Sequence, residues 1–277
     1  MDLKLKGKHI LITGASGGIG IELTKQFLTE GVNVTACYNR EKRQLSDLME
    51  SFTDNLLTVS ADIRKEDSAK ELFTQANSRF GRVDGAIANA GIANHEGVSV
   101  SEMSLDQWDN TLRVNLTGSF LTAKHFFQNL EKYPGDDASL ILVGSTAGLF
   151  GEAWYSDYST SKAGMHGMMM SLKNEIVHLA SRGRVNLVNP GWTVTPMAEG
   201  AVSDPIMVSR IVQTIPLRKI AEPADIASTI VFLTSDYVSG HVSGQTVTVA
   251  GGMEGRVLFT PDEVSDYVDR YTSKEKW

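Results

Sequence analysis

Short apolar runs rich in Val, Ile and Leu alternate with longer segments of helical period along most of the chain. The short runs have the length of buried strands, and the longer segments repeat apolar residues as amphipathic helices do. We expect strands at 8–13, 32–37, 56–60, 84–88, 139–143, 184–188 and 246–249. We expect helices at about 18–30, 41–51, 66–80, 106–131, 156–181 and 223–234.

This alternation predicts an α/β fold, a doubly wound, Rossmann-like parallel sheet of about seven strands with helices on both faces. Ligands bind such sheets beyond the carboxyl ends of the strands. A chain of 277 residues is long for one domain and short for two enzyme-sized ones. We expect a single domain over 1–253, in which 191–222 is an irregular, proline-containing substrate loop, followed by an extension over 254–277.

Composition argues against several kinds of partner. A net charge of −7, with scattered Lys and Arg, disfavours nucleic acid. The chain lacks a long apolar run and a hydrophobic signal core, so we expect no membrane association and a cytoplasmic location. Cys37 is the only cysteine, so no intrachain disulfide can form, and no histidines pair at metal-ligand spacing. We therefore expect no metal site.

The first expected strand runs directly into a glycine-rich turn, Thr13 to Gly20, which precedes a helical segment. Its glycines follow the spacing Gly-x3-Gly-x-Gly. Such glycines allow a tight turn and let a pyrophosphate approach backbone N–H groups at a helix N-terminus. The turn therefore predicts a dinucleotide site formed by Gly14, Ser16, Gly17, Gly18, Ile19 and Gly20.

Tyr158 and Lys162 are four residues apart on an expected helix, so they share one face. A phenol titrates at about pH 10 and a neighbouring cation stabilises its phenolate, so we expect Lys162 to lower the pKa of Tyr158. Ser145 follows an expected strand, where its hydroxyl can donate to a substrate oxygen that gains negative charge. These residues suit a carbonyl/alcohol redox site. A serine hydrolase fits poorly, because Gly144 to Gly148 lacks the Gly-x-Ser-x-Gly pattern.

From residue 7 to about 253 the chain resembles the classical branch of the short-chain dehydrogenase/reductase family. Thr13 to Gly20 resembles the family's TGxxxGIG loop, and Ala88 to Gly91 resembles its NNAG motif with the first Asn replaced. Tyr158 to Lys162 resembles its YxxxK motif, and Pro190 to Thr195 resembles the PG motif after the sixth strand.

The resemblance implies that Tyr158 is the general acid in reduction and the general base in oxidation, assisted by Ser145. It also implies that Lys162 contacts the nicotinamide ribose and that Asn115 holds a water linking Lys162 to solvent. The other implied cofactor contacts are Asp62 and Ile63 at the adenine, Asn89, Ala90 and Gly91 at its ribose, the backbone of Pro190, Gly191 and Thr193 beneath the nicotinamide, and Thr195 at the carboxamide.

The choice between dinucleotides depends on the end of the second strand, where NAD enzymes commonly carry an acidic residue for the ribose 2′-OH. Here Tyr38 is followed by Asn39 and Arg40, with no acid. A guanidinium suits a 2′-phosphate, so NADP(H) is favoured as cofactor. NAD(H) stays open, because Gly17 lies where many NADP-preferring relatives carry Arg or Lys, and Arg40 could simply be a solvated helix start.

The leading hypothesis is an NADP(H)-dependent oxidoreductase that interconverts a ketone and a secondary alcohol. The alternatives are an NAD-dependent sugar or polyol dehydrogenase and a nucleotide-binding regulatory protein without turnover. An enoyl reductase is disfavoured, because that branch spaces its Tyr and Lys more widely. We expect a small, neutral carbonyl or alcohol substrate, lined by Phe150, Trp154, Trp192 and Met197 together with Asn94, His95, Glu152 and Asp157.

The helix that carries Lys162 is rich in methionine, which indicates core or interface packing, and the family resemblance implies a homo-oligomer, a dimer or tetramer. In the extension, Thr260 to Glu263 has the pattern of a helix start. Val264, Tyr267, Val268 and Tyr271 then line one face of a short amphipathic helix. We expect this face to dock on a neighbouring subunit.

Overall fold

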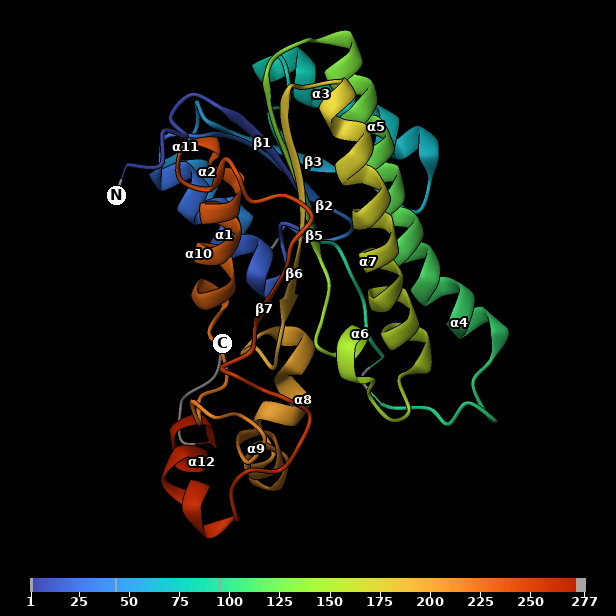
Figure 1. Cartoon of the computed structure of the whole chain (residues 1–277), viewed down its shortest axis with the longest axis vertical. Helices are drawn as coiled ribbons and strands as arrows, with labels where there is room; N and C mark the ends of the chain where they lie inside the picture. The colour runs from blue at the N-terminus through green and yellow to red at the C-terminus, as the bar shows by residue number, and fades with distance from the viewer. Residues whose placement is uncertain (1, 43, 95, 273–277) are drawn as a thin grey trace.

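The computed structural model describes residues 2–42, 44–94 and 96–272 and contains a seven-stranded sheet in the order β3-β2-β1-β4-β5-β6-β7 (Figure 1). Every neighbouring pair of strands is parallel. The expected doubly wound, Rossmann-like sheet is therefore confirmed. Its strands are β1 His9–Thr13, β2 Asn33–Tyr38, β3 Leu56–Ser60, β4 Gly85–Ala88, β5 Asp137–Val143, β6 Arg182–Pro190 and β7 Thr246–Val249.

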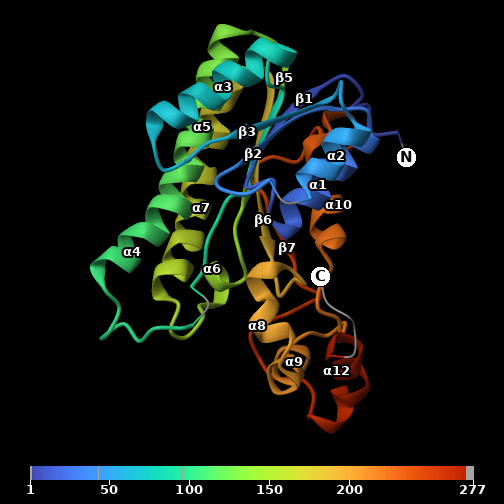
Figure 2. The same cartoon turned by 180° about the vertical axis from the view of Figure 1, so that it is seen from behind.

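Helices cover both faces of the sheet, as the two opposite views in Figures 1 and 2 show. One face carries α1 Gly18–Thr29, α2 Leu45–Ser51, α10 Pro223–Thr234 and α11 Asp236–Ser239. The other carries α3 Glu66–Phe80, α5 Gly118–Lys132 and α7 Ser156–Glu175, with α4 Leu105–Leu112 leading into α5. None of the helices within the described residues is long and apolar enough to cross a membrane.

Two apolar cores follow from this layering. Phe27 of α1 is buried in the core on one face and Phe126 of α5 in the core on the other. The strands between them are apolar on both sides, because both faces of the sheet are covered. Side chains of β1 alternate between the two cores: Ile10 and Ile12 enter the first, and Leu11 enters the second.

One expected helix is interrupted. The segment predicted as a helix over 106–131 forms α4, a π-helical turn Arg113–Thr117, and α5. A π-helical turn widens the helix by one residue and is often found at functional sites. Here it contains Asn115, which is completely buried.

The segment 191–222 is not irregular throughout, so that expectation was wrong for its middle part. It contains a 3-10 turn Pro196–Ala198, α8 Glu199–Val202 and α9 Pro205–Val212. Asp204 caps α9 by accepting a hydrogen bond from the N–H of Ile206 at 2.9 Å, and Pro205 occupies the first helical position. Proline is favourable there, because that position needs no N–H donor, so the residue starts this helix rather than breaking it.

The extension folds back onto this segment. A 3-10 turn Asp262–Val264 leads into α12 Ser265–Thr272, and the side-chain carboxylate of Glu263 accepts from the N–H of Thr260 at 2.8 Å. Val264 and Val268 are buried in a third apolar cluster with α9 of the same chain. The hypothesis that this stripe docks on a neighbouring subunit is corrected accordingly, because α9 already covers it. Residues 273–277 of the extension lie outside the described residues.

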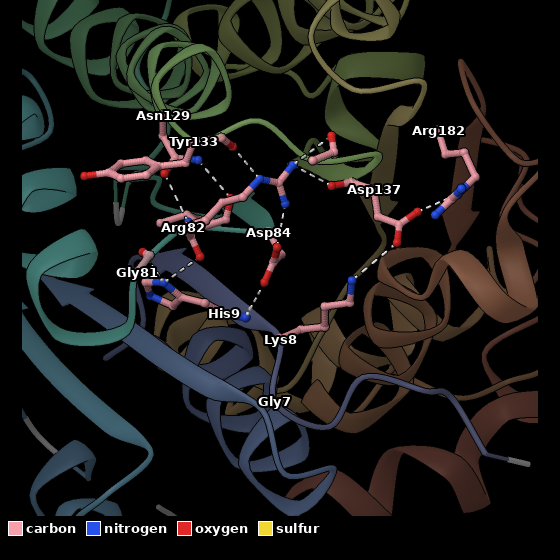
Figure 3. A network of polar contacts seen from close by, with 12 residues as sticks. Gly7, Lys8, His9, Gly81, Arg82, Asp84, Asn129, Tyr133, Asp137 and Arg182 are labelled. Carbon is pink, nitrogen blue, oxygen red and sulfur yellow. Dashed lines mark hydrogen bonds and ion pairs between the residues drawn. The ribbon is translucent and has the colours of Figure 1, made fainter.

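The amino ends of the central strands are tied together by a polar network (Figure 3). The carboxylate of Asp84 accepts from the N–H of His9 at 2.9 Å and from the guanidinium of Arg82 at 2.5 Å. Asp137, at the start of β5, accepts from Arg182, at the start of β6, at 2.6 Å. This network fixes the end of the sheet opposite to the one where parallel sheets bind ligands.

Candidate active site

Ser145, Tyr158 and Lys162 come together at the carboxyl end of β5. Ser145 follows that strand, and Tyr158 and Lys162 lie one turn apart in α7, with the Lys162 Nζ 5.7 Å from the centroid of the Tyr158 ring. The side chain of Ser145 lies close enough to the Tyr158 phenol to act on its pKa. The three residues predicted for the reacting centre thus lie side by side in the structure.

Lys162 is held at the end of β5. Its ammonium donates to the backbone carbonyl of Val143 at 2.8 Å, and the side chain is only 5% exposed. Burial lowers the pKa of Lys162 to about 8, because a buried cation loses its hydration. The group therefore titrates much closer to neutrality than an ordinary lysine.

The pKa of Tyr158 is shifted in the direction opposite to the one expected. Burial raises the pKa of the phenol above its ordinary value, and the hydrogen bond from Ser145 opposes this rise. The expectation that Lys162 lowers the pKa of Tyr158 is not met, because the ammonium is bonded to Val143 and the loss of hydration around the phenol dominates. Ser145 is the neighbour that stabilises the phenolate.

Asn115 links three elements around the site. Its Oδ1 accepts from the N–H of Ile92 at 2.8 Å, and its Nδ2 donates to the carbonyl of Ile92 at 2.9 Å and to the hydroxyl of Ser161 at 3.0 Å. A Cβ on Gly91 would lie 3.2 Å from the Lys162 Nζ and 3.4 Å from the Asn115 Oδ1. Any side chain at position 91 would therefore enter the space beside both polar groups.

Three glycines of the glycine-rich turn are packed so tightly that a side chain at any of them would collide with its neighbours. A Cβ on Gly14, which has φ +65°, would lie 2.7 Å from the Cα of Ala90, and one on Gly20 would lie 2.2 Å from the carbonyl oxygen of Gly14. A Cβ on Gly18 would lie 2.7 Å from the Cγ2 of Thr195. The turn therefore offers bare backbone at the start of α1, which fits the pyrophosphate of a dinucleotide.

Asn89 joins the end of β4 to this turn. Its Nδ2 donates to the carbonyls of Thr13 and Gly14 at 3.0 Å each, and the Thr13 hydroxyl accepts from the N–H groups of Asn89 and Ala90 at 3.2 Å each. The expected ribose-side residues are thus rigidly positioned against the expected phosphate loop.

The carboxylate of Asp62 is already engaged. Arg64 donates to its two oxygens at 2.9 Å and 2.8 Å, and this hydrogen bonding holds the pKa of Asp62 below its ordinary value. The neighbouring Ile63 is buried, and a Cβ on Gly118 would lie 2.5 Å from its Cδ1. Sequence reasoning missed Arg64, although its position two residues after Asp62 is a recognisable signal for a local ion pair.

The end of β2 presents a cation and no acid. Asn39 and Arg40 are exposed, and the Asn39 carbonyl accepts from the Ser60 hydroxyl at 3.1 Å. The Nζ of Lys42 lies 5.8 Å from the centroid of the Tyr38 ring. Since β2 lies beside β1 in the sheet, these side chains are close to the phosphate loop.

The PG motif ends β6 and begins the substrate loop. A Cβ on Gly191 would lie 2.7 Å from the Cβ of Ala250, and the Pro190 carbonyl accepts from the N–H of Thr146 at 2.9 Å. Thr193 forms a parallel bridge with Ala221, at the far end of the loop. The motif is therefore fixed to both β7 and the segment that follows Ser145.

The residues expected to line the substrate differ in their exposure. Asp157 is 2% exposed and accepts from the hydroxyl of Thr111 at 2.8 Å, because the first turn of α7 packs on α4. Trp192 packs on the third apolar cluster. Phe150, Trp154 and Met197 are instead exposed, by 46%, 65% and 50%. His95 lies outside the described residues.

The remaining polar candidates differ in their surroundings. Asn94 is partly exposed, and Glu152 is exposed although burial of part of its carboxylate raises its pKa. Among the described residues, no group of three or more His, Cys, Asp and Glu side chains could hold a metal ion.

Asn189 is a positioning residue that sequence reasoning missed. Its Oδ1 accepts from the N–H of Ser145 at 3.1 Å, and a Cβ on Gly144 would lie 2.0 Å from the same oxygen. The side chain is 2% exposed. The signal was the amide side chains of Asn186 and Asn189 among the apolar residues of 185–189, because a buried polar group needs a partner.

Known proteins resemble this chain over nearly its whole length. Residues 14–254 match a family model described as enoyl-(acyl carrier protein) reductase. Acetoacetyl-CoA reductase from Acinetobacter sp. is 34% identical over 253 residues, 89% of this chain and 97% of the relative. The 3-oxoacyl-(acyl-carrier-protein) reductase FabG from Staphylococcus epidermidis is 34% identical over 251 residues, 89% of this chain and 98% of the relative.

A third relative and a solved structure are similar to the chain over a comparable length. The 3beta-hydroxysteroid dehydrogenase 1 from Eggerthella lenta is 34% identical over 258 residues, 90% of this chain and 94% of the relative. A crystal structure from Brucella melitensis, described as a short-chain dehydrogenase/reductase, glucose/ribitol dehydrogenase, superposes with a TM-score of 0.83 at 30% identity and covers 92% of this chain and 99% of that one.

Proposed function

Because the chain belongs to the short-chain dehydrogenase/reductase family, we propose that it is an NADP(H)-dependent oxidoreductase that interconverts a ketone and a secondary alcohol, with Tyr158 as general acid and base. Family membership makes the chain an oxidoreductase acting on carbonyl and alcohol groups. The proposal concerns the dinucleotide, the acid and the substrate. The observation that carries it is the meeting of Ser145, Tyr158 and Lys162 at the end of β5.

Each residue of the site has a distinct task. Tyr158 donates a proton to the substrate oxygen in reduction and accepts one in oxidation. Ser145 donates a hydrogen bond to the same oxygen and opposes the rise in the pKa of Tyr158. Lys162, with its pKa of about 8, supplies positive charge beside the phenol and exchanges protons near neutrality. We propose that Asn115, which lies beside Gly91, holds a water that links Lys162 to solvent.

The dinucleotide site is supported by the cradle of glycines. The close packing at Gly14, Gly18 and Gly20 leaves bare backbone at the start of α1 to bind the pyrophosphate. Asn89, Ala90 and Gly91 would border the adenosine ribose, and Thr193 and Thr195 would border the nicotinamide. The bound nicotinamide supplies or takes up the hydride. The exposed Arg40 after β2 favours NADP(H), and NAD(H) remains the alternative.

We propose a ketone with an apolar substituent as substrate. The exposed Phe150, Trp154 and Met197 lie on the loops after β5 and β6, where the substrate is expected. The names of three relatives refer to acetoacetyl-CoA, to a 3-oxoacyl group on acyl carrier protein and to a 3beta-hydroxysteroid, and each of these carries a carbonyl or hydroxyl group on an apolar framework. A sugar or polyol is the second candidate, favoured by the name of the Brucella structure.

A screen of carbonyls, alcohols and an enoyl thioester, followed by absorbance at the nicotinamide band with both dinucleotides, tests the proposal. Tyr158→Phe should abolish turnover while dinucleotide affinity is kept, and Tyr133→Phe, a partly exposed tyrosine at the other end of the sheet, should behave as the wild type. Turnover by Tyr158→Phe would reassign the acid. Reduction of the enoyl thioester alone would make the protein an enoyl reductase, and binding without turnover would make it a regulatory protein.

We also infer a homo-oligomer. The exposed sides of α5 and α7 carry Phe120 and Met170, which are 50% and 42% exposed, and Val177 beyond α7 is 47% exposed. Exposed apolar side chains on two helices of one face suit a protein interface. A mass of one chain by light scattering would contradict this inference.

A further inference from the structure

The segment after the family match, residues 255–272, packs on the substrate-loop helices of its own chain. Val264 and Val268 of this extension share an apolar cluster with Val208 and Val212 of α9. Figures 1 and 2 both show α8, α9 and α12 together beyond the carboxyl end of the sheet. The extension therefore lies at the same end of the molecule as Ser145 and Tyr158.

Hydrogen bonds fix the extension to the backbone of the loop at two places. The N–H groups of Leu258 and Phe259 donate to the carbonyl of Gln213, at the end of α9, at 2.8 Å and 3.3 Å. The hydroxyl of Tyr271 accepts from the N–H of Ile220 at 2.9 Å and donates to the carbonyl of the same residue at 3.2 Å. A single phenol thus satisfies both backbone groups of Ile220.

Ile220 directly precedes Ala221, where the end of the substrate loop pairs with its beginning near the expected nicotinamide position. The N–H of Ala221 donates to the carbonyl of Trp192 at 2.9 Å, and the N–H of Val194 donates to the carbonyl of Ala221 at 2.8 Å. Thr195, one residue further on, packs against Gly18. Tyr271 therefore acts on the base of the loop, next to residues expected to contact the nicotinamide.

Arg218 adds an independent contact. It has φ +48°, in the left-handed region that is unfavourable for a residue with a Cβ, so its surroundings must hold it there. Its guanidinium carbon lies 4.1 Å from the ring centroid of Phe259 and 5.8 Å from that of Tyr267, both in the extension. The loop backbone is thus held by aromatic side chains that come from the extension.

The extension also reaches the other wall of the site. A Cβ on Gly255 would lie 3.4 Å from the Cδ1 of Phe150, the last residue of α6 Ala147–Phe150, the helix that follows Ser145. The segment therefore contacts both the α8–α9 helices and α6, the elements on either side of the expected substrate position.

We propose that residues 255–272 form an intramolecular brace that fixes α8 and α9 beside Ser145 and Tyr158, with Tyr271 as the positioning residue. The brace holds the substrate loop ordered before the substrate binds, so binding does not have to order it. The effect of the brace on kinetics rests on the proposed function, whereas its effect on the order of the substrate loop is independent of that function.

Deletion of 258–277 is the obvious test but a poor one, because it would expose the apolar side of α9 and could unfold the loop entirely. Tyr271→Phe removes only the hydroxyl that bonds Ile220. Tyr237→Phe is a matched control, since that tyrosine is 67% exposed on α11. The readouts are amide hydrogen exchange over 199–213 and 217–221 in the full chain, and KM and kcat for the best ketone from the screen.

We expect Tyr271→Phe to speed exchange in both segments by about fivefold and to raise KM for the ketone by about the same factor, with kcat and dinucleotide affinity changed less than twofold. Exchange equal to that of Tyr237→Phe overturns the brace. So does faster exchange with an unchanged KM. If the wild type reduces no carbonyl, the proposed function has failed, and the exchange data alone decide the brace.

Discussion

The carboxylate of Asp157 accepts a hydrogen bond at 2.8 Å from the backbone N–H of Tyr158, the residue that follows it. The other oxygen of this carboxylate accepts from the hydroxyl of Thr111 at 2.8 Å and from the side-chain amide of Gln107 at 3.3 Å. The first turn of α7 is thereby tied to α4. The backbone of the proposed acid is positioned by a residue that does not touch the substrate.

Replacement of Asp157 by Ala should therefore lower kcat without a matching rise in KM and should destabilise the protein by about 2 kcal/mol, because a buried N–H and a hydroxyl lose their acceptor. Asp157→Asn should recover most of both losses, since its amide oxygen can still accept from Tyr158. Steady-state kinetics and urea unfolding measure the two effects. Asp54→Ala, at an exposed aspartate, serves as the control. Equal losses in the Ala and Asn variants would contradict a positioning role.

The buried ammonium of Lys162 should lower the free energy of unfolding at neutral pH. Its pKa is lowered to about 8 by burial, so between about pH 8 and its ordinary value the unfolded chain binds more protons than the folded one. Stability should rise with pH across that window. Lys162→Met should be inactive yet more stable than the wild type at pH 7, by up to about 3 kcal/mol, with the gain shrinking as pH rises through the window.

Urea unfolding at pH 7 and pH 9.5 checks this prediction, with Lys25→Met, at an exposed lysine of α1, as the control. A Lys162→Met variant that is less stable than the wild type at pH 7 would mean that the hydrogen bond to Val143 outweighs the loss of hydration.

The order of strands and helices could be predicted from the sequence, and so could the proximity of Ser145, Tyr158 and Lys162, because both depend on local patterns. Tyr158 and Lys162 share a helix face, and Ser145 follows an apolar run. The inward turn of Asp157 could not be predicted, since its partner Thr111 is 46 residues away along the chain. A position next to the proposed acid therefore predicts a place in the substrate pocket, which Asp157 does not take.

The substrate loop shows a second limit of prediction. Its prolines predict an irregular segment, whereas Pro205 begins α9. Because the sequence does not predict α9, it offers no partner in the same chain for the apolar face of the extension. A neighbouring subunit is then the expected partner. The burial of Val264 and Val268 depends on the packing of the extension against α9, which the sequence of neither segment predicts by itself.

Buried His9 should make the fold sensitive to acid. Its Nδ1 lies 3.2 Å and 3.3 Å from the carbonyl oxygens of Arg82 and Gly81, which only accept, so Nδ1 carries the proton (Figure 3). Its Nε2 lies 2.8 Å from the hydroxyl of Thr35, which leaves Nε2 as the acceptor. Burial lowers the pKa of His9, so the unfolded chain takes up a proton before the folded one as pH falls.

The contribution of neutral His9 to the free energy of unfolding should be fully present above the ordinary pKa of 6.5 and should be lost as the pH falls below it. In urea unfolding between pH 7 and pH 5, His9→Gln should have a lower free energy of unfolding but a flatter dependence on pH, by up to about 1.4 kcal/mol per pH unit. His178→Gln, at an exposed histidine, should keep the wild-type slope. Parallel curves for the wild type and His9→Gln would contradict the assignment.

Arg40 should decide the preference between the two dinucleotides. It is exposed after β2, no acidic residue stands between it and Tyr38, and a 2′-phosphate would add a charge-assisted, bidentate partner for its guanidinium. Arg40→Ala should weaken NADPH binding by about 10-fold to 100-fold, the range for a hydrogen bond to a charged group, and leave NADH binding within twofold. Fluorescence titration with both dinucleotides measures this, with Lys25→Ala as the control for a general change in charge. Equal losses of affinity for NADPH and NADH would show that Arg40 contacts a part common to both cofactors. No loss of affinity for either would show that Arg40 does not set the preference, and the phosphate loop at Gly17 would then be the candidate.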